Sequence, residues 1–189
     1  MSDSTLENSI VKLRAPEPTD LELLYNWENN MEIWKVSNTL TPFSRFVLKR
    51  YIETSHIDIW ESKQLRLIIE AKNQNALMNV PVGIVDLYDF DPFHLRAGVG
   101  ILIANNEFRQ KGYATEALSV LIKYSFETLQ LHQLYCNISS QNTISLQLFK
   151  SHRFQEIGTK KQWIKTPNGW HDEVMLQLIN PFSGSSKKN

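Results

Sequence analysis

A glycine-containing turn between a predicted strand and a predicted helix carries the clearest chemical signal in this chain. Val99 to Ala104 is a short apolar run typical of a buried strand, and a helical period begins at Gly112. The first amides of a helix have no acceptor within the helix, and the helix dipole favours an anion there. Gly112 lets a ligand approach the backbone closely, while Arg109 and Lys111 add positive charge. The turn therefore predicts an anion site suited to a pyrophosphate.

Other readings of this turn stay open. An ordinary strand-to-helix connection can contain a glycine without binding anything. The turn lacks the Gly-Lys-Ser/Thr ending of a nucleotide-triphosphate loop and the three spaced glycines of a dinucleotide site. A different nucleotide-phosphate binder using the same turn is a further alternative.

The elements that must position this turn follow from periodicity and turn signals. We expect strands at residues 10–15, 64–71, 80–90, 95–104, 132–138, 154–165 and 170–179, and helices at residues 19–29, 43–56, 112–129 and 142–151. Thr19 and Glu22 read as a capping box, and Met31 to Thr41 reads as a loop that carries Trp34. The crossover from the fourth strand to the fifth predicts a parallel pair, so the class is α/β (α+β mixed), a mixed sheet of six to seven strands flanked by helices.

Composition bounds the function. The chain has 189 residues, and its 20 Lys and Arg balance its 20 Asp and Glu, which argues against a nucleic-acid binder. The histidines are scattered, so we expect no metal site, and a single cysteine, Cys136, excludes an internal disulfide. No apolar run approaches the ~20 residues of a membrane span, and no signal peptide is evident, so we expect a cytoplasmic protein with no membrane partner. We predict a flexible N-terminus (1–8), one domain (9–180) and a disordered tail (181–189).

Three segments in order resemble one family. Arg109-x-x-Gly112-x-Ala114 resembles the Arg/Gln-x-x-Gly-x-Gly/Ala signature of the GNAT family of N-acetyltransferases. The run from Asn142 to Phe149 resembles the helix that lies along the coenzyme A arm in that family. Residues 166–175 resemble the closing hairpin of two branches, the spermidine N-acetyltransferases and the ribosomal-protein alanine N-acetyltransferases. The resemblance implies the acyl-CoA N-acyltransferase fold, with acetyl-CoA as co-substrate.

The resemblance also implies positions for the co-substrate. The strand edge at Leu102, Ile103 and Ala104 would face the pantetheine and thioester, and Asn142 and Ser145 would lie beside the pantetheine arm. The pyrophosphate would be held by the amides of one continuous run of residues. These are Arg109, Gln110, Lys111, Gly112, Tyr113, Ala114 and Thr115.

Residues for the acceptor side come from the sequence itself. Asp86 shares an alternating strand face with Tyr88, where a carboxylate can attract an ammonium and relay its proton; a solvated strand-end carboxylate is the alternative. Trp34 and Tyr88 are candidates for lining an acceptor pocket, with core packing as the alternative for both. Cys136 has no histidine in a recognisable arrangement, so we expect a small buried core residue.

Two departures from the family pattern keep a second function open. Phe149 stands where the family often has the tyrosine that protonates the departing thiolate, and residues 98–100 read Gly-Val-Gly where a glutamate is frequent. The leading hypothesis is transfer of the acetyl group to a primary amine, a small amine or a protein N-terminus, by direct attack in a ternary complex. The alternative is a non-catalytic acyl-CoA-binding or sensing module. The spermidine branch has an acidic stretch after its first helix, whereas residues 36–43 are neutral here, which weakens a polyamine acceptor. A homo-oligomer is compatible with all of this.

Overall fold

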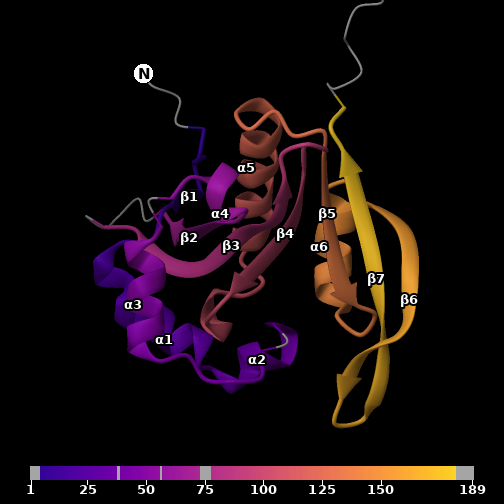
Figure 1. Ribbon diagram of the computed structural model, residues 1–189, viewed down its shortest axis with the longest axis horizontal. Coiled ribbons are helices and arrows are strands. Elements are labelled where there is room, and N and C mark those ends of the chain that lie inside the picture. Colours follow the sequence, from indigo (N-terminus) through magenta and orange to yellow (C-terminus); the bar gives the residue numbers. More distant parts are fainter. Residues whose placement is uncertain (1–4, 38, 56, 73–77, 182–189) are drawn as a thin grey trace, which may run out of the picture.

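The computed structural model describes residues 5–37, 39–55, 57–72 and 78–181. The predicted turn at 72–75, most of the predicted tail and the first residues of the predicted flexible N-terminus lie outside these ranges. The described residues form one mixed sheet of seven strands in the order β1-β2-β3-β4-β5-β7-β6, with helices on both faces (Figure 1). The predicted α/β mixed sheet is confirmed.

The bounds of the elements lie close to the predicted ones. The strands are β1 (Val11–Arg14), β2 (Leu65–Ala71), β3 (Val80–Asp91), β4 (Arg96–Ile103), β5 (Gln133–Ser139), β6 (Gln155–Thr166) and β7 (Gly169–Ile179). The helices are α1 (Leu21–Glu28), α2 (Met31–Ser37), α3 (Arg45–Glu53), α4 (Ile59–Ser62), α5 (Tyr113–Glu127) and α6 (Thr143–Ser151), with short 3₁₀ turns η1 (Pro18–Asp20) and η2 (Asn106–Phe108).

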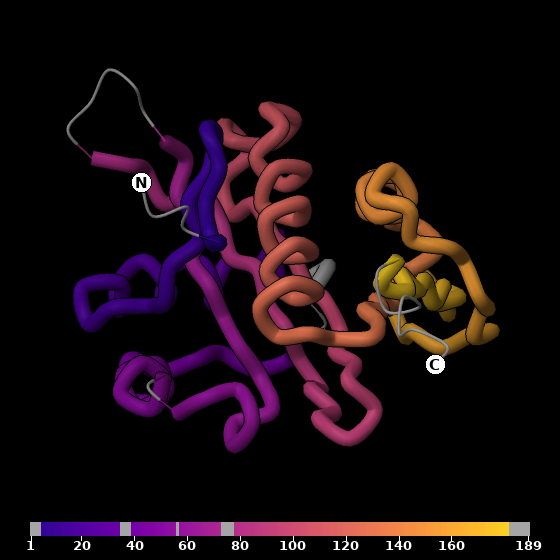
Figure 2. Tube along the Cα trace, turned by 90° about the horizontal axis from the view of Figure 1, so that it is seen from above, coloured from indigo at the N-terminus to yellow at the C-terminus, as the bar shows by residue number. Residues whose placement is uncertain are grey.

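The apolar periodicity of the strands and helices divides the core between the two faces of the sheet. On one face, α5 packs Ala117, Leu118 and Leu121, all fully buried, against strand residues such as Leu87. On the other face, α1 and α3 pack onto Ile68. Figure 2 shows α5 lying along the sheet, on the side away from α1 and α3.

The sheet divides at the junction of β4 and β5. These strands are parallel, as predicted, but they pair only from Arg96–Gln133 to Gly98–Tyr135. Beyond Gly98, β4 continues to pair with β3 as far as Ile103, and β5 continues to pair with β7 as far as Ser139. Within the described ranges, the far halves of β4 and β5 therefore each have one edge without a strand partner, and the two groups of strands separate in Figure 2.

The predicted loop at residues 31–41 is wrong in its first part, which forms α2. Asn30 starts this helix, because its side-chain oxygen accepts the amide of Glu32 at 2.9 Å and its carbonyl accepts the amide of Ile33 at 2.9 Å. Ile33 is then buried, which holds the helix against the domain. Neighbouring residue 38 lies outside the described ranges.

The predicted capping box at Thr19 and Glu22 is also wrong. Pro18 begins a 3₁₀ turn before α1, and the Asp20 carboxylate accepts the amide of Glu17 at 2.7 Å. Glu22 instead forms an ion pair with Arg45 on α3, with 2.7 Å between Oε1 and Nε. The side chain that was expected to cap α1 therefore ties α1 to α3.

The predicted flexible N-terminus is corrected at its inner end. Glu7 forms a β-bridge with Lys12, and the side-chain oxygen of Asn8 accepts the amide of Val11 at 2.9 Å. The side-chain amide of Asn8 donates to Glu116 on α5 at 2.8 Å. These contacts attach residues 7 and 8 to the domain, which therefore begins before residue 9.

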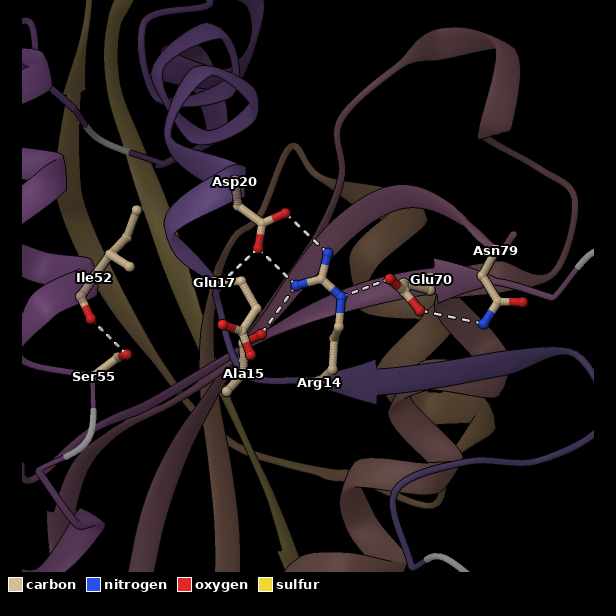
Figure 3. A network of polar contacts seen from close by, with 8 residues as sticks. All are labelled: Arg14, Ala15, Glu17, Asp20, Ile52, Ser55, Glu70 and Asn79. Carbon is tan, nitrogen blue, oxygen red and sulfur yellow. Dashed lines mark hydrogen bonds and ion pairs between the residues drawn. The ribbon is translucent and has the colours of Figure 1, made fainter. Parts of the chain in front are cut away.

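A buried ion network fixes the start of α1 to the sheet (Figure 3). Arg14 on β1 binds both oxygens of Asp20, at 2.6 and 2.9 Å, and binds Glu70 on β2 at 2.5 Å. The side chain of Asp20 is only 7% exposed. Asn79 donates to the second oxygen of Glu70 at 3.2 Å, which completes the network.

This network predicts a loss of stability in acid. Burial alone would raise the pKa of Asp20, but the hydrogen bonds from Arg14 and the Glu17 amide outweigh it and lower the pKa. The stabilisation is therefore present above the unfolded-state pKa and is lost as pH falls through the folded-state pKa. We expect Asp20→Asn to lower the free energy of unfolding by about 2 kcal/mol at pH 7, because a buried ion pair loses one partner. Urea unfolding measures the free energy of unfolding of both proteins. The difference between wild type and Asp20→Asn should become smaller as the pH falls toward 3, and a difference that does not change with pH would contradict this prediction.

Candidate active site

The turn before α5 presents unpaired backbone amides. Gly112 is the N-cap of α5 at φ 84, and Gln110 also has a positive φ of 59. The first helical hydrogen bond runs from Glu116 to the Gly112 carbonyl at 3.0 Å, so within the described structure the amides of residues 110–115 have no acceptor. The amide of Arg109 differs, because it donates to the Asn106 carbonyl at 3.1 Å. Its backbone is thereby removed from the predicted set of pyrophosphate donors.

Positive side chains surround this turn. Arg109 lies beside the end of β4, where its Nε donates to the Ile103 carbonyl at 3.2 Å. The ammonium of Lys111 lies 5.9 Å from the centre of the Phe108 ring and is exposed. With the dipole of α5 added, the turn is an electropositive surface that suits a phosphate group.

A pocket of about 280 Å³ opens beside the turn, at the end of β4. Residues from the start of α2 and from the loop between β4 and α5 line it. They are Asn30, Glu32, Ala104, Asn105, Asn106, Glu107 and Arg109. Ala104, which was predicted to face the co-substrate, therefore lines this pocket. Its backbone amide donates to the carbonyl of Val82 on β3 at 3.0 Å.

The register of β4 decides which of its backbone groups face the open edge. The Ala104 amide reaches β3, and hydrogen-bonded positions alternate along an antiparallel pair. Leu102, opposite Ile84, therefore directs its amide and carbonyl to β3, while Ile101 and Ile103 direct theirs to the edge that β5 has left. Of the strand-edge residues predicted to face the pantetheine and thioester, Ile103 directs its backbone groups to the open edge, whereas Leu102 directs them to β3. Ile101 could not be named from the sequence, because its orientation depends on the register between β3 and β4.

The start of α6 uses two of the predicted cofactor residues as a cap. The side-chain oxygen of Asn142 accepts the Ser145 amide at 3.1 Å. Asn142 thus caps the helix. The groups that remain available to a ligand are the side-chain NH₂ of Asn142 and the hydroxyl of Ser145. Their role toward a co-substrate stays a prediction.

The predicted base, Asp86, belongs to an ion network on the face that carries α1 and α3. Arg66 of β2 binds both of its oxygens, Nε to Oδ1 at 2.8 Å and Nη2 to Oδ2 at 2.9 Å, and also pairs with Glu28 of α1. The guanidinium lies 5.6 Å from the centre of the Tyr51 ring. Asp86 is therefore a paired carboxylate, and the two carboxylates outnumber the one guanidinium, which leaves a net negative charge on this network of three side chains.

Tyr88 lies at the point where β4 and β5 separate. Its ring occupies the space above Gly98, where an added Cβ would be 2.3 Å from the ring, and it meets Tyr135 edge to face at 6.0 Å between centroids. A side chain at position 98 would collide with the Tyr88 ring, so this position requires a glycine. Burial raises the pKa of Tyr88, so its hydroxyl stays protonated at neutral pH.

Trp34 joins the same network from α2. Its indole N–H donates to the Glu28 carbonyl at 2.5 Å, and the Glu28 side chain pairs with Arg66. Asp86 and Tyr88 therefore share the face of the sheet that carries α1 and α3, and Trp34 is linked to this face through Glu28. Sequence reasoning missed Arg66 and Glu28, because the Arg66–Asp86 pairing depends on the register between β2 and β3.

Cys136 and Phe149, both discussed above from the sequence, are buried in the core. Cys136 is 1% exposed and burial raises its thiol pKa to about 12, which agrees with the expected core residue and removes it as a nucleophile. Phe149 is 3% exposed and packs edge to face on Phe154, with 5.0 Å between centroids.

Among the described residues, no cluster of three or more His, Cys, Asp or Glu is arranged to hold a metal ion. Within the same ranges, no helix has the length and apolarity needed to cross a membrane.

Comparison with known proteins agrees with this fold. A family model described as an acetyltransferase (GNAT) domain matches residues 11–155. The chain therefore belongs to the GNAT family of acetyltransferases, enzymes that use acetyl-CoA.

Several curated relatives resemble most of the chain. The spermidine N(1)-acetyltransferase of Vibrio cholerae is 29% identical over 154 residues, which span 80% of this chain and 82% of the relative. The enzyme of the same name from Escherichia coli is 27% identical over 148 residues, spanning 78% of this chain and 74% of the relative. An uncharacterized N-acetyltransferase, p20, from Bacillus licheniformis is 27% identical and covers 93% of this chain and 96% of its own length.

Solved structures confirm the fold. The Vibrio cholerae spermidine N-acetyltransferase in complex with CoA and spermine superposes with a TM-score of 0.79 at 24% identity, over 92% of this chain and 97% of that one. A ribosomal alpha-N-protein acetyltransferase in complex with coenzyme A superposes with a TM-score of 0.76 at 15% identity, over 91% of this chain and 95% of that one. At these identities the likeness establishes the architecture alone.

Proposed function

We propose that this protein transfers the acetyl group of acetyl-CoA to a primary amine, a small amine or a protein N-terminus, by direct attack in a ternary complex. The observation that carries the proposal is the set of unpaired amides at residues 110–115, next to an edge of β4 that has lost its strand partner. An anion site beside an open strand edge suits a co-substrate that joins a diphosphate to an amide-containing arm.

The residues present fit acetyl-CoA. The amides of residues 110–115 and the positive side chains of Arg109 and Lys111 would hold its pyrophosphate. The backbone groups of Ile101 and Ile103 would pair with the amides of the pantetheine arm, as a neighbouring strand does. Asn142 and Ser145 would contact the same arm from α6.

The acceptor side must attract and deprotonate an amine. An alkyl ammonium has a pKa of about 10.4 and is not nucleophilic until it loses a proton. The Asp86–Arg66–Glu28 network has a net negative charge that attracts the cation. Because Arg66 engages both oxygens of Asp86, we propose that the proton passes to Asp86 through water. Trp34 and Tyr88 would bound the acceptor beside this network.

The attacked thioester develops negative charge on its carbonyl oxygen, and an amide of the β4 edge, at Ile101 or Ile103, would stabilise it. The departing sulfur meets no acidic side chain at position 149. It therefore leaves as a free thiolate or takes its proton from water.

Phe149→Tyr tests this account of the leaving group. We expect kcat to rise by about tenfold with little change in KM, because a hydroxyl acid then serves the departing thiolate. The new hydroxyl enters the contact with Phe154, so a modest loss of thermal stability accompanies the gain. Steady-state kinetics and thermal unfolding of the same preparations measure both effects. An unchanged or lower kcat would show that position 149 lies away from the sulfur.

The acceptor itself is proposed only as a class. Two of the relatives named above are spermidine N(1)-acetyltransferases, but residues 36–43 of this chain are neutral, which favours another amine or a protein N-terminus. One neighbour, the spermidine N-acetyltransferase of Vibrio cholerae, has been solved as a dodecamer at a TM-score of 0.72, and we propose a homo-oligomer here, to be tested by light scattering.

The deciding experiment combines binding and turnover. Acetyl-CoA is titrated into the protein, and acetylated products are then sought by mass spectrometry across spermidine, spermine, simple alkyl amines and peptides with free N-termini. Micromolar binding with transfer to any amine supports the proposal. If spermidine is the best acceptor, the inference from residues 36–43 against a polyamine acceptor is wrong. Tight CoA binding with no transfer across the panel would instead favour the acyl-CoA-binding module, and no binding would refute both.

A further inference from the structure

A second charged cluster lies across the separation of the sheet from Asp86, on β5, β6 and β7. The Nζ of Lys160 on β6 donates to Glu173 Oε2 on β7 at 2.7 Å and to Asn137 Oδ1 on β5 at 3.1 Å. Lys160 and Glu173 face each other in the register of β6 and β7. The centre of the Trp163 ring lies 5.1 Å from the same ammonium. One ammonium therefore connects three strands of the sheet.

This cluster lies on the same face of the sheet as Asp86 and Tyr88. Side chains alternate along a strand, so Tyr135 and Asn137 of β5 share one face, and the Tyr135 ring meets the Tyr88 ring edge to face. Burial raises the pKa of Tyr88, and the Asn137 side chain beside its hydroxyl opposes this shift. Contacts therefore run from Tyr88 through Asn137 to Lys160, across the separation between β4 and β5 that Figure 2 shows.

Gly100 leaves room for a ligand group between Asp86 and Tyr88. An added Cβ at this position would lie 4.0 Å from Asp86 Oδ2 and 4.0 Å from the Tyr88 ring, both ordinary contact distances. Gly100 is on the half of β4 that does not pair with β5, next to the edge amide of Ile101. An acceptor nitrogen over Gly100 would lie beside the proposed base, with Tyr88 between it and Lys160.

The Lys160 ammonium has a donor left for a ligand. An ammonium carries three donors and no acceptor, and Glu173 and Asn137 take two of them. Among the described residues, no other oxygen or nitrogen takes the third. The Lys160 side chain is 36% exposed and the Glu173 side chain 11%, so a ligand meets the cation of this pair. A carbonyl or carboxylate oxygen can accept the third proton, whereas a second ammonium cannot.

We propose that Lys160 selects the acceptor: its third N–H binds a carbonyl or carboxylate oxygen near the reacting amine, so the enzyme prefers peptide N-termini to polyamines. This inference rests on the proposed function and narrows its acceptor class. Spermidine has further ammonium groups where a peptide has carbonyls, and a cation close to Lys160 is repelled. Glu173 and Asn137 hold the ammonium in place before the acceptor arrives, which lowers the cost of ordering it on binding.

Lys160→Met tests the inference through opposite effects on two acceptors. We expect kcat/KM for triglycinamide to fall about tenfold, mainly through KM, because one charge-assisted hydrogen bond is lost. For spermidine, kcat/KM should rise by about threefold or more, since the repelling charge is gone. Propylamine has neither a carbonyl nor a second ammonium and should change by less than about twofold. Each acceptor is compared with itself in the two proteins, so differences in pKa between the amines cancel.

Triglycine separates the two kinds of oxygen. It has the peptide carbonyls of triglycinamide and a free carboxylate in addition. Equal falls in kcat/KM for the two peptides identify a peptide carbonyl as the group that Lys160 binds, and a larger fall for triglycine identifies its carboxylate. Either result supports the inference.

Two further variants control for stability and for charge. Lys160→Met leaves the Glu173 carboxylate without its cation, which lowers stability. The double variant Lys160→Met with Glu173→Gln removes both charges, and it should show the same change of preference at a melting temperature closer to that of wild type. Lys161→Met is the matched control, because Lys161 is the next lysine of β6, is 77% exposed and pairs with Asp172 at 2.8 Å. Its acceptor preference should equal that of wild type.

The outcomes distinguish this inference from the proposed function. An equal loss of kcat/KM for all acceptors in the single and double variants, or an unchanged preference, would overturn the role of Lys160 while the transferase activity stands. If wild type acetylates no acceptor, the proposed function is wrong, and calorimetric titration of triglycinamide into the complex with CoA still decides on Lys160. Binding about tenfold weaker to Lys160→Met than to wild type supports the contact, and equal binding refutes it.

Discussion

Gly112→Ala should weaken the binding of CoA more than tenfold while the protein stays folded. At φ 84 an alanine is strained, which costs about 1 kcal/mol of stability. An added Cβ would meet no protein atom within 4 Å, so the folded chain offers no further penalty. The same Cβ would lie beside the unpaired amides of residues 110–115, where a pyrophosphate must approach the backbone. The larger effect therefore falls on the ligand, and calorimetric titration with CoA measures it.

Gly169→Ala is the matched control. Gly169 also has a positive φ, 119, and an added Cβ there also meets nothing within 4 Å, but it is the first residue of β7, where the hairpin from β6 closes. We expect it to lower the melting temperature without changing the dissociation constant for CoA. Equal losses of CoA affinity in the two variants would show that the effect of Gly112→Ala is strain transmitted through the fold and not a blocked ligand site.

Asp86→Asn should lower kcat/KM for acetyl transfer by about a hundredfold or more. The substitution keeps the size of the side chain but removes the charge that attracts the ammonium and the base that receives its proton. Among the described residues it also leaves Arg66 with Glu28 as its one carboxylate partner, so the charge of the network changes from net negative to neutral. Affinity for CoA should stay within about twofold of wild type, because Asp86 lies on the opposite face of the sheet from α5.

The control for this variant is Asp172→Asn. Asp172 is also an ion-paired strand carboxylate, 2.8 Å from Lys161, but it lies on β7 in the exposed part of the hairpin. It should leave kcat/KM unchanged. If Asp86→Asn retains most of its activity at a normal melting temperature, Asp86 serves the structure alone and the proton leaves by another route.

The order of the elements could be predicted because local signals agree with the tertiary structure. The strands and the helices expected from residues 43 and 142 follow from neighbouring residues in the sequence, and all are present, the two helices being capped by Ser44 and Asn142. The failures occurred where a non-local partner changed a local preference. Glu22 pairs with Arg45 from another helix, and the loop expected after residue 30 becomes α2, where Ile33 is buried.

The candidate site divides in the same way. The turn at Gly112 could be recognised because its signal, a strand followed by glycine and a helical period, is contiguous. Arg66, Glu28 and Tyr135 could not be named, because each reaches the site through strand register or helix packing. The orientation of the β4 amides likewise depends on which residues pair with β3, so Ile101 and Leu102 could not be told apart.

The most direct test of the central claim is amide mapping by ¹H–¹⁵N correlation spectra with CoA and, separately, with pantetheine, which lacks the diphosphate. We predict that CoA shifts the amides of residues 110–115 strongly, and that pantetheine leaves them unchanged while shifting Ile101 and Ile103. Shifts at residues 110–115 that are the same with both ligands, or absent with CoA, would contradict the claim that these amides bind the diphosphate.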